Sequence, residues 1–212
     1  MSQSPIPSLV VMARWPASGR CKRRLAVDIG SEQAALIQQR LTAHTFAVAE
    51  ALNKQGDVDV QVAMSGVSLR SAQRSLPSLP PCTLVDQGRG SLGARMLRQI
   101  HHARFRQHNK PVIVIGTDLA DLCQSDLLHA IQKLQNQPLV LGPSADGGYW
   151  LLGLGSALTQ QQLDALVADV PWGSNKVFDI TCAHARRLDL TPHQLSMKND
   201  IDCLADLSSW QR

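Results

Sequence analysis

The chain has few aromatic residues, no paired cysteines and no long apolar run, and each of these absences excludes a class of protein. Aromatic residues make up 4% of the 212 residues, which disfavours nucleic-acid binding because such proteins often stack bases on aromatic side chains. The five cysteines are scattered and form no CxxC pair, so we expect free thiols in the cytoplasm rather than disulfides or zinc. No apolar run approaches the roughly 20 residues that cross a bilayer, and the first residues lack the features of a signal peptide. Membrane insertion is therefore not expected.

Positive charge is concentrated in one segment. The net charge of the chain is +4, and residues 14–24 hold five basic side chains and no acidic one: Arg14, Arg20, Lys22, Arg23 and Arg24. Basic and acidic residues nearly balance in the rest of the chain. A basic loop on a nearly neutral body suits a small anion such as a nucleotide phosphate, whereas nucleic-acid binders usually spread their charge over a face.

Short apolar runs alternate with longer helical patterns, which predicts a single α/β domain over residues 1–212. Hydrophobic residues make up 44% of the chain and charged residues 18%, as is ordinary for a globular domain. We expect strands at residues 9–13, 58–62, 83–85, 112–115, 139–141 and 149–152. We expect helices at residues 31–54, 92–106, 174–187 and 203–210, and one more that Ser125 caps; Ser31 and Ser174 also suit helix caps.

Ligands of open α/β sheets bind at the carboxyl ends of the strands, and four polar or glycine-rich segments occupy that position. They are residues 13–25, 116–122, 142–150 and 198–202. In the first segment, Gly19 lets backbone N–H groups approach phosphate oxygens, and Lys22 with the arginines can neutralise them. The GxxxxGK[ST] spacing of a Walker A loop is absent, and a solvated basic loop is the alternative.

Asp118 follows the most hydrophobic predicted strand, where a buried carboxylate is costly unless it is paired or holds a cation. It is therefore a candidate ligand for Mg²⁺ or Mn²⁺, with capping of the next turn as the alternative. For the nearby Asp121, a capping role is favoured. Asp200 or Asp202 could be a second metal ligand, although acids in the first turn of a helix also stabilise the helix dipole.

Two further features indicate contact with a ligand, each with a structural alternative. Gly147 and Gly148 follow Asp146 between two predicted strands. This arrangement is consistent either with close approach of a ligand to the backbone or with a plain hairpin turn. Trp172 is either a stacking surface for a base or sugar or a buried anchor of its loop.

Residues 88–93 match the GxGxxG pattern between a strand and a helix, which raises the alternative of an NAD(P)-binding oxidoreductase. The preceding strand is short and ends in polar residues, and this unit is the third along the chain. A dinucleotide site here would also leave the basic loop and the 146–148 turn unexplained. We therefore expect no NAD(P) binding.

Four motifs occur in order: VMARWPASGRCKRRL at residues 11–25, GSLGARM at 90–96, GTD at 116–118 and LGPSADGGY at 141–149. Together they resemble a bacterial family of GT-A-like transferases described as glycosyltransferases of arsenosugar biosynthesis. The resemblance extends from about residue 9 to residue 207. This family is grouped with the nucleotide-diphosphosugar transferases and is similar to small nucleotidyltransferases that activate molybdopterin or phospholactate.

The resemblance implies a GT-A fold with a seven-stranded, mostly parallel mixed sheet flanked by helices. The nucleotide-binding set that we expect within its motifs is Ala13, Arg14, Gly19, Lys22, Arg24, Ser91 and Arg95. A divalent metal, Mg²⁺ or Mn²⁺, is expected on Asp118, Asp200 and Asp202. The expected substrate-binding residues are Asp146, Gly147 and Gly148, together with Trp172 as the stacking surface. The chain departs from the family pattern at Arg23, where Thr is usual, and at Ala120, where Pro is usual, so the phosphate and metal geometry can differ there.

The predicted function is metal-dependent transfer from a nucleotide-sugar donor to a small-molecule acceptor. Lys22 would help to neutralise the leaving diphosphate and Asp146 would accept the acceptor's proton, so these two form the predicted catalytic set. A nucleotidyltransferase that releases pyrophosphate from a nucleoside triphosphate is the main alternative. A nucleotide-binding regulator without turnover is a further one.

Overall fold

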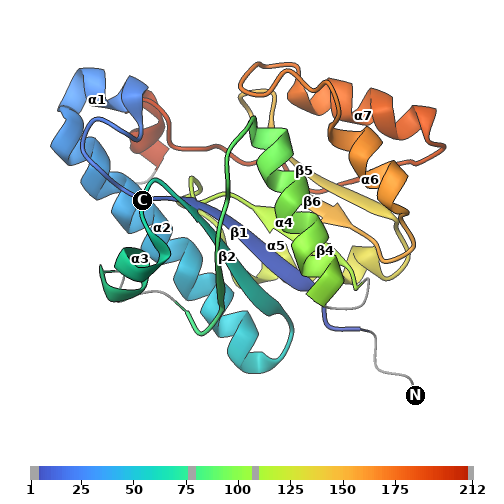
Figure 1. The fold of residues 1–212 in the computed structure, drawn as a ribbon. Helices are drawn as coiled ribbons and strands as arrows, with labels where there is room; N and C mark the ends of the chain where they lie inside the picture. Colours follow the sequence, from blue (N-terminus) through green and yellow to red (C-terminus); the bar gives the residue numbers. More distant parts are fainter. Residues whose placement is uncertain (1–4, 76–79, 107–109, 210–212) are drawn as a thin grey trace.

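The computed structural model describes residues 5–75, 80–106 and 110–209, and it shows one seven-stranded sheet covered by helices (Figure 1). The strands are β1 (Ser8–Arg14), β2 (Asp59–Ser65), β3 (Thr83–Asp86), β4 (Val112–Ile115), β5 (Leu139–Pro143), β6 (Tyr149–Leu154) and β7 (His193–Gln194). The helices are α1 (Arg23–Ile29), α2 (Ser31–Gln55), α3 (Leu69–Ser75), α4 (Leu92–Arg106), α5 (Gln124–Leu134), α6 (Gln160–Val167) and α7 (Val177–Arg187), followed by the 3₁₀ helix η1 (Leu204–Ser209). The predicted α/β class is confirmed.

The sheet is mixed and mostly parallel, as predicted. Its strand order is β3-β2-β1-β4-β6-β5-β7. β1 pairs in parallel with β2 and β4, β2 with β3, and β5 with β7, whereas β6 runs antiparallel to both β4 and β5. Because β1 and β4 are parallel neighbours, the loops that follow them leave the sheet at the same edge.

Side chains of β1 alternate between two hydrophobic cores, one on each face of the sheet. Leu9, Val11 and Ala13 pack in the core that includes side chains of α2 and α5. Val10 packs in the opposite core with α4, α6 and α7. The alternation follows from the pleat of a strand. Since helices cover both faces, apolar residues are needed on both, and the strand has a continuous apolar run.

Helix α1 and the 3₁₀ helix η1 come together beside α2. Helix α1 packs on α2 and also contacts η1, and Figure 1 shows the blue α1 next to the red η1. The basic segment near the start of the chain therefore lies close to the acidic segment near its end. No helix in the described part of the chain is long and apolar enough to cross a membrane.

Several helix starts differ from the prediction. Ser31 is the first residue of α2, after the cap residue Gly30. α5 follows the cap residue Cys123, whose N–H donates to Asp126 at 2.9 Å, so Ser125 is not its cap. α7 begins only at Val177, and Ser174 lies in the loop before it. The predicted last helix is a short 3₁₀ helix, and its predicted end at Trp210 lies outside the described residues. Helices α1, α3 and α6 and strand β7 were not predicted.

Candidate active site

A pocket with a volume of about 290 Å³ opens at the carboxyl ends of β1 and β4, beside the β5–β6 hairpin. Apolar side chains such as Met12 and Met96 form most of its wall. Asp118, Asp146 and Asp200 line the same pocket, although they come from three separate loops. The fold thus brings these three predicted site residues together where open α/β sheets bind ligands.

Short stretches of backbone pairing place Asp118 and Asp200 near each other. Leu119, the residue after Asp118, forms an antiparallel bridge with Asp200. The segment that carries Asp200 also forms a parallel bridge between Lys198 and Ser144. It therefore connects the loop after β4 to the β5–β6 hairpin and carries a carboxylate to the pocket.

The three carboxylates repel one another in a partly dry environment. Burial, and after it the negative charges of Asp118 and Asp146, raise the pKa of Asp200 to about 7. Lys22 and a hydrogen bond from the Ser144 hydroxyl, at 3.4 Å, act in the opposite direction. A carboxyl group with a pKa raised in this way marks a place where an added positive charge would be stabilised.

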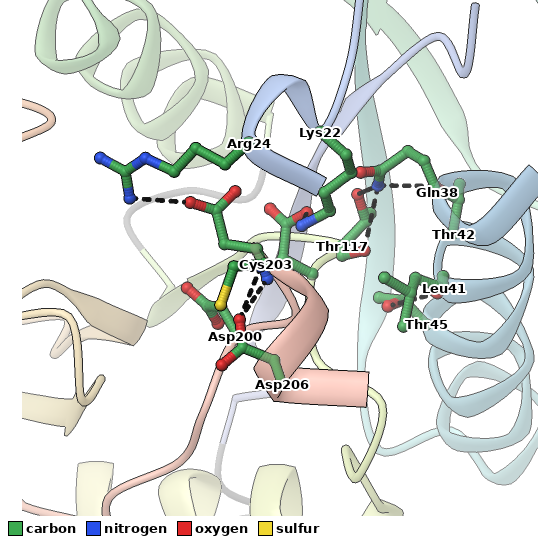
Figure 2. A network of polar contacts seen from close by, with 12 residues as sticks. Lys22, Arg24, Gln38, Leu41, Thr42, Thr45, Thr117, Asp200, Cys203 and Asp206 are labelled. Carbon is green, nitrogen blue, oxygen red and sulfur yellow. Dashed lines mark hydrogen bonds and ion pairs between the residues drawn. The ribbon is translucent and has the colours of Figure 1, made fainter. Parts of the chain in front are cut away.

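Lys22 supplies part of that positive charge (Figure 2). Its Nζ lies 2.5 Å from Oδ1 of Asp118, and its side chain is only 5% exposed. The Lys22 backbone has a φ of 45°, in the left-handed region, at the point where the basic loop turns into α1. This conformation is uncommon for a residue with a Cβ. The basic loop therefore reaches the acidic pocket through a single ammonium group.

Gln38 and Thr117 support the turn that carries Asp118. Gln38 lies on the buried face of α2, and its Nε2 donates to the carbonyl and hydroxyl oxygens of Thr117, both at 3.2 Å (Figure 2). This pair was not predicted from the sequence. A signal was present, because Gln38 interrupts an apolar stripe of a long helix, and a buried amide needs a hydrogen-bond partner.

Lys198 is a second residue whose role was not predicted from the sequence. Its Nζ lies 3.1 Å from Asp121 and 3.0 Å from Asp126, and its side chain is 10% exposed. The ammonium group also lies 5.8 Å from the ring centre of Trp150. Lys198 thus attaches the segment that carries Asp200 to the start of α5, and Asp121 pairs with this lysine.

Asp202 does not join the pocket. Its carboxylate forms an ion pair with Arg24, with an Nη1–Oδ2 distance of 3.0 Å, on the exposed side of α1. Among the described residues that line the pocket, Asp200 is present and Asp202 is not. The structure therefore distinguishes Asp200 from Asp202, which the sequence alone did not. Arg24 pairs with Asp202 and does not line the pocket.

Ser91 and Arg95 lie at the start of α4. The Ser91 hydroxyl accepts a hydrogen bond from the Ala94 N–H at 3.2 Å, which satisfies one free donor of the helix. Arg95 donates to the side chain of Gln87 at 2.7 Å, and Gln87 in turn donates to the carbonyl of Ala13 at 3.0 Å. Arg95 and Ala13 are thus joined through Gln87 beside the pocket, while Arg14 and Gly19 lie exposed in the basic loop.

The β5–β6 hairpin contains a tight turn, and one of its two adjacent glycines lines the pocket. Asp146 accepts a hydrogen bond from the Gly148 N–H at 2.9 Å, which closes the turn, and Gly148 lines the pocket. Gly147 has a φ of 87° and packs against the backbone of Asn175, so a side chain there would collide with the protein itself. The close approach at Gly147 is therefore internal to the chain.

Trp172 is both an anchor of its loop and part of the pocket wall. Its ring meets Tyr149 edge to face, with ring centres 6.1 Å apart, and it lies against Gly93. It also lines the pocket. These contacts fix the orientation of the ring that the pocket presents.

The glycine pattern at residues 88–93 does not form a dinucleotide site of the expected type. It follows β3, which is the edge strand of the sheet, whereas dinucleotide folds place the pattern after the first, central strand. Arg98 donates to the carbonyls of Gln87 and Arg89 at 2.6 and 3.0 Å. Its guanidinium also fills the space next to Gly88. This loop is therefore held by the chain's own arginine.

The carboxylates suit a metal that shares its ligands with a substrate. Within residues 5–75, 80–106 and 110–209, no three His, Cys, Asp or Glu side chains form a ready-made metal cluster. Mg²⁺ is usually held by one or two carboxylates, with water and substrate phosphates as the other ligands. Asp118 and Asp200 offer such a partial set, and the electrostatics of Asp200 favour a cation beside it.

Several solved structures with a similar fold are described as transferases or synthases that act on nucleotides or nucleotide sugars. A protein from Desulfovibrio desulfuricans G20, described as a candidate nucleotide-diphospho-sugar transferase, has a TM-score of 0.82 and 24% identity over 97% of this chain and 86% of its own. The 4-diphosphocytidyl-2C-methyl-D-erythritol synthase of Anaerococcus prevotii DSM 20548 has a TM-score of 0.60 and 9% identity over 97% and 99%. Glucosyl-3-phosphoglycerate synthase of Mycobacterium tuberculosis, in complex with Mn²⁺, UDP and glucosyl-3-phosphoglycerate, has a TM-score of 0.53 and 12% identity over 96% and 75%.

The fold is thus that of the nucleotide-diphospho-sugar transferases, as the motifs implied. The chain belongs to the family DUF2064, described as an uncharacterized protein conserved in bacteria, whose model matches residues 45–174. That range includes Asp118, Asp146 and Trp172, whereas the basic loop and Asp200 lie outside it. No curated protein matches the chain.

Proposed function

We propose that the chain is a metal-dependent transferase that moves a glycosyl group from a nucleotide-sugar donor to a small acceptor, with residues 1–212 acting as one catalytic domain. The observation that carries this proposal is the meeting of Asp118, Asp146, Asp200 and Lys22 at the carboxyl ends of β1 and β4. The neighbour with bound Mn²⁺ and UDP supports the same chemistry on this fold. A role in arsenosugar biosynthesis and a cytoplasmic location stay predictions.

The basic loop binds the donor's phosphates in this proposal. Gly19 has a φ of 71° and leaves its side open, and Arg14 is exposed next to it. Lys22 extends from this loop to Asp118, so one ammonium group can contact a diphosphate that lies between loop and pocket. Ser91 and Arg95 border the same edge from α4. Charge-assisted hydrogen bonds from such groups are stronger than neutral ones.

Asp118 and Asp200 would hold Mg²⁺ or Mn²⁺. The bound ion would supply positive charge that stabilises the leaving diphosphate. Asp146 lies exposed at the pocket and accepts the proton of the acceptor hydroxyl. The acceptor oxygen then bonds to the sugar carbon as the bond from that carbon to the diphosphate breaks, and the electron pair leaves with the diphosphate. Lys22 stabilises the charge that develops there.

Nucleotidyl transfer is the second candidate. It is supported by the Anaerococcus synthase, which matches nearly the whole of both chains, and by a further neighbour described as a CMP-2-keto-3-deoxy-manno-octonic acid synthetase in complex with CTP. In this reaction a substrate oxygen attacks the α-phosphate of a nucleoside triphosphate and pyrophosphate leaves. The same loop and carboxylates would serve it.

Products distinguish the two reactions. The full chain is incubated with Mn²⁺ and either nucleotide sugars or nucleoside triphosphates, and the released phosphates are analysed by anion-exchange chromatography. Glycosyl transfer predicts a nucleoside diphosphate from a nucleotide sugar, without pyrophosphate. Metal-dependent pyrophosphate from a triphosphate would support the second candidate. Binding without turnover across broad donor and acceptor panels would contradict both reactions.

A further inference from the structure

The pocket beside Asp118 combines an apolar wall with an acidic side. Met12, Met96 and Val114 form one part of the wall, and Trp172 closes it. Among the described residues that line the pocket there are three aspartates and no lysine, arginine or histidine. Anion-binding sites usually present Lys, Arg or a helix N-terminus to the ligand. Apart from a metal ion held by Asp118 and Asp200, the described lining therefore offers no cationic group to a phosphate.

The nearest cationic side chains do not offset the negative charge of the pocket lining. Lys22 is already 2.5 Å from Asp118, and in the proposed function it turns to the donor's diphosphate. Arg24 is paired with Asp202 outside the pocket. A bound divalent ion would carry two positive charges, but the donor's diphosphate brings negative charge of at least similar size. A phosphorylated acceptor in the pocket would thus meet the carboxylate of Asp146, which is not one of the proposed metal ligands, and like charges repel.

The apolar wall indicates which kind of ligand the pocket favours. Trp172 is held edge to face on Tyr149 and cannot swing away without losing that contact. Leu92, at the start of α4, is 36% exposed and extends the same wall toward solvent. Apolar surface of this kind favours a ligand with an apolar face, because both surfaces leave water together.

We infer that this pocket receives an uncharged acceptor that carries a hydroxyl group and an apolar face, and that it rejects phosphorylated acceptors. The inference rests on the proposed function, because it assigns the pocket to the acceptor of that transfer. It also favours glycosyl transfer over nucleotidyl transfer, since a pocket without a cationic side chain for the acceptor does not suit a phosphorylated substrate whose phosphate attacks a nucleotide.

Two matched probes test this inference: phenyl β-D-glucoside and phenyl β-D-glucoside 6-phosphate. Their affinities for the full chain are measured by isothermal titration calorimetry, both alone and with Mn²⁺ and UDP. We expect the neutral probe to bind at least tenfold more tightly than its phosphate. Equal or tighter binding of the phosphorylated probe would overturn the inference, as would a failure of the neutral probe to bind.

A charge placed in the wall sharpens the test. Leu92→Lys adds a cation at the pocket, and we expect it to reduce the preference for the neutral probe at least fivefold. Leu128→Lys is the matched control, because Leu128 is similarly exposed at 39% but lies on α5, outside the pocket lining. An equal effect of both variants would contradict the assignment. Melting temperatures check that both variants fold.

Failure of the proposed function gives a different result. If no nucleoside diphosphate stabilises the chain with Mn²⁺ while the neutral probe still binds with the expected preference, the transferase proposal fails and the chemistry of the pocket stands. If nucleotide and Mn²⁺ bind while the probe preference is reversed, the transferase proposal stands and the inference fails.

Discussion

The basic loop after β1 and the pocket after β4 have opposite charge, although they share one edge of the sheet. The loop holds five cations without an acid in residues 14–24, while the described pocket lining holds three acids without a cation. Lys22 connects them through its ion pair with Asp118. The parallel pairing of β1 with β4 makes them neighbours. The difference teaches that this fold places a basic loop and an acidic pocket side by side, as the proposed binding of a metal-bound nucleotide requires.

The largest expected effect comes from Asp118→Asn, which removes a negative charge from the acidic side. If Asp118 holds the metal, the loss of charge should lower the transfer rate on the order of 10²–10⁴-fold. The melting temperature should fall modestly, because the buried Lys22 loses its ion-pair partner. Rates and melting curves measure both. Unchanged metal-dependent activity would remove Asp118 from the site.

Lys22→Met should have the next largest effect, because it removes the ion pair that links the two regions. A charge-assisted hydrogen bond contributes about 1.5–3 kcal/mol, so nucleotide affinity should fall roughly 10–100-fold. Mn²⁺ alone should bind more tightly, since Asp118 is released from the ammonium group. Lys54→Met is the control, because it removes an equal charge from an exposed ion pair on α2. Calorimetry with UDP and with Mn²⁺ separates the two effects, and weaker binding of both would contradict the account.

A moderate effect is expected from pH through Asp200. With a folded-state pKa of about 7, lowering the pH from 8 to 6 should weaken Mn²⁺ binding about tenfold, because the ion must displace a proton. The unfolded chain releases this proton near pH 4, so between about pH 4 and 7 the folded state binds more protons. The contribution of Asp200 to stability therefore falls as the pH rises through this range.

Asp200→Asn should remove the pH dependence that Asp200 gives to Mn²⁺ affinity and to folding stability. Its stability relative to the unmodified chain should rise between pH 5 and pH 7.5, as measured by denaturant unfolding at each pH. A constant difference over this range would show that Asp200 titrates as an ordinary carboxyl group.

The smallest effect is expected from Asp202→Asn. Its ion pair with Arg24 is exposed on both sides, and such pairs contribute about 0–1 kcal/mol. We expect Mn²⁺ affinity to change less than twofold. A loss comparable to that of Asp118→Asn would show that the acidic region extends beyond the pocket.

Much of the fold follows from the sequence because strand patterns depend on local alternation. The buried run at Val112–Ile115 was placed without error, and its position alone indicated that Asp118 lies at a strand end. Helix α6 was missed although Thr159 and Gln162 form reciprocal hydrogen bonds at its start, a pairing with a recognisable T-x-x-Q pattern. Helix α1 has no such signal, since it is short and starts from the left-handed Lys22.

The remaining features of the site depend on contacts between distant segments. Asp200 and Asp202 look equivalent in the sequence, and only the bridge between Leu119 and Asp200 decides which one lines the pocket. The pairing of Lys22 with Asp118 likewise needs β1 and β4 to be neighbours. Local propensity contains no information on either contact, so the sequence could propose these residues but could not pair them.

The most direct test of the account is the thermal stability of the full chain with nucleoside diphosphates alone, Mn²⁺ alone and both together, using UDP, CDP, ADP and GDP. If the basic loop and the acidic pocket form one site, at least one diphosphate should stabilise the chain far more with Mn²⁺ than without it. At 100 times its Kd, a ligand should add about 2.7 kcal/mol. No stabilisation by any diphosphate with Mn²⁺, or tight NADH binding that Gly90→Val abolishes, would contradict the account.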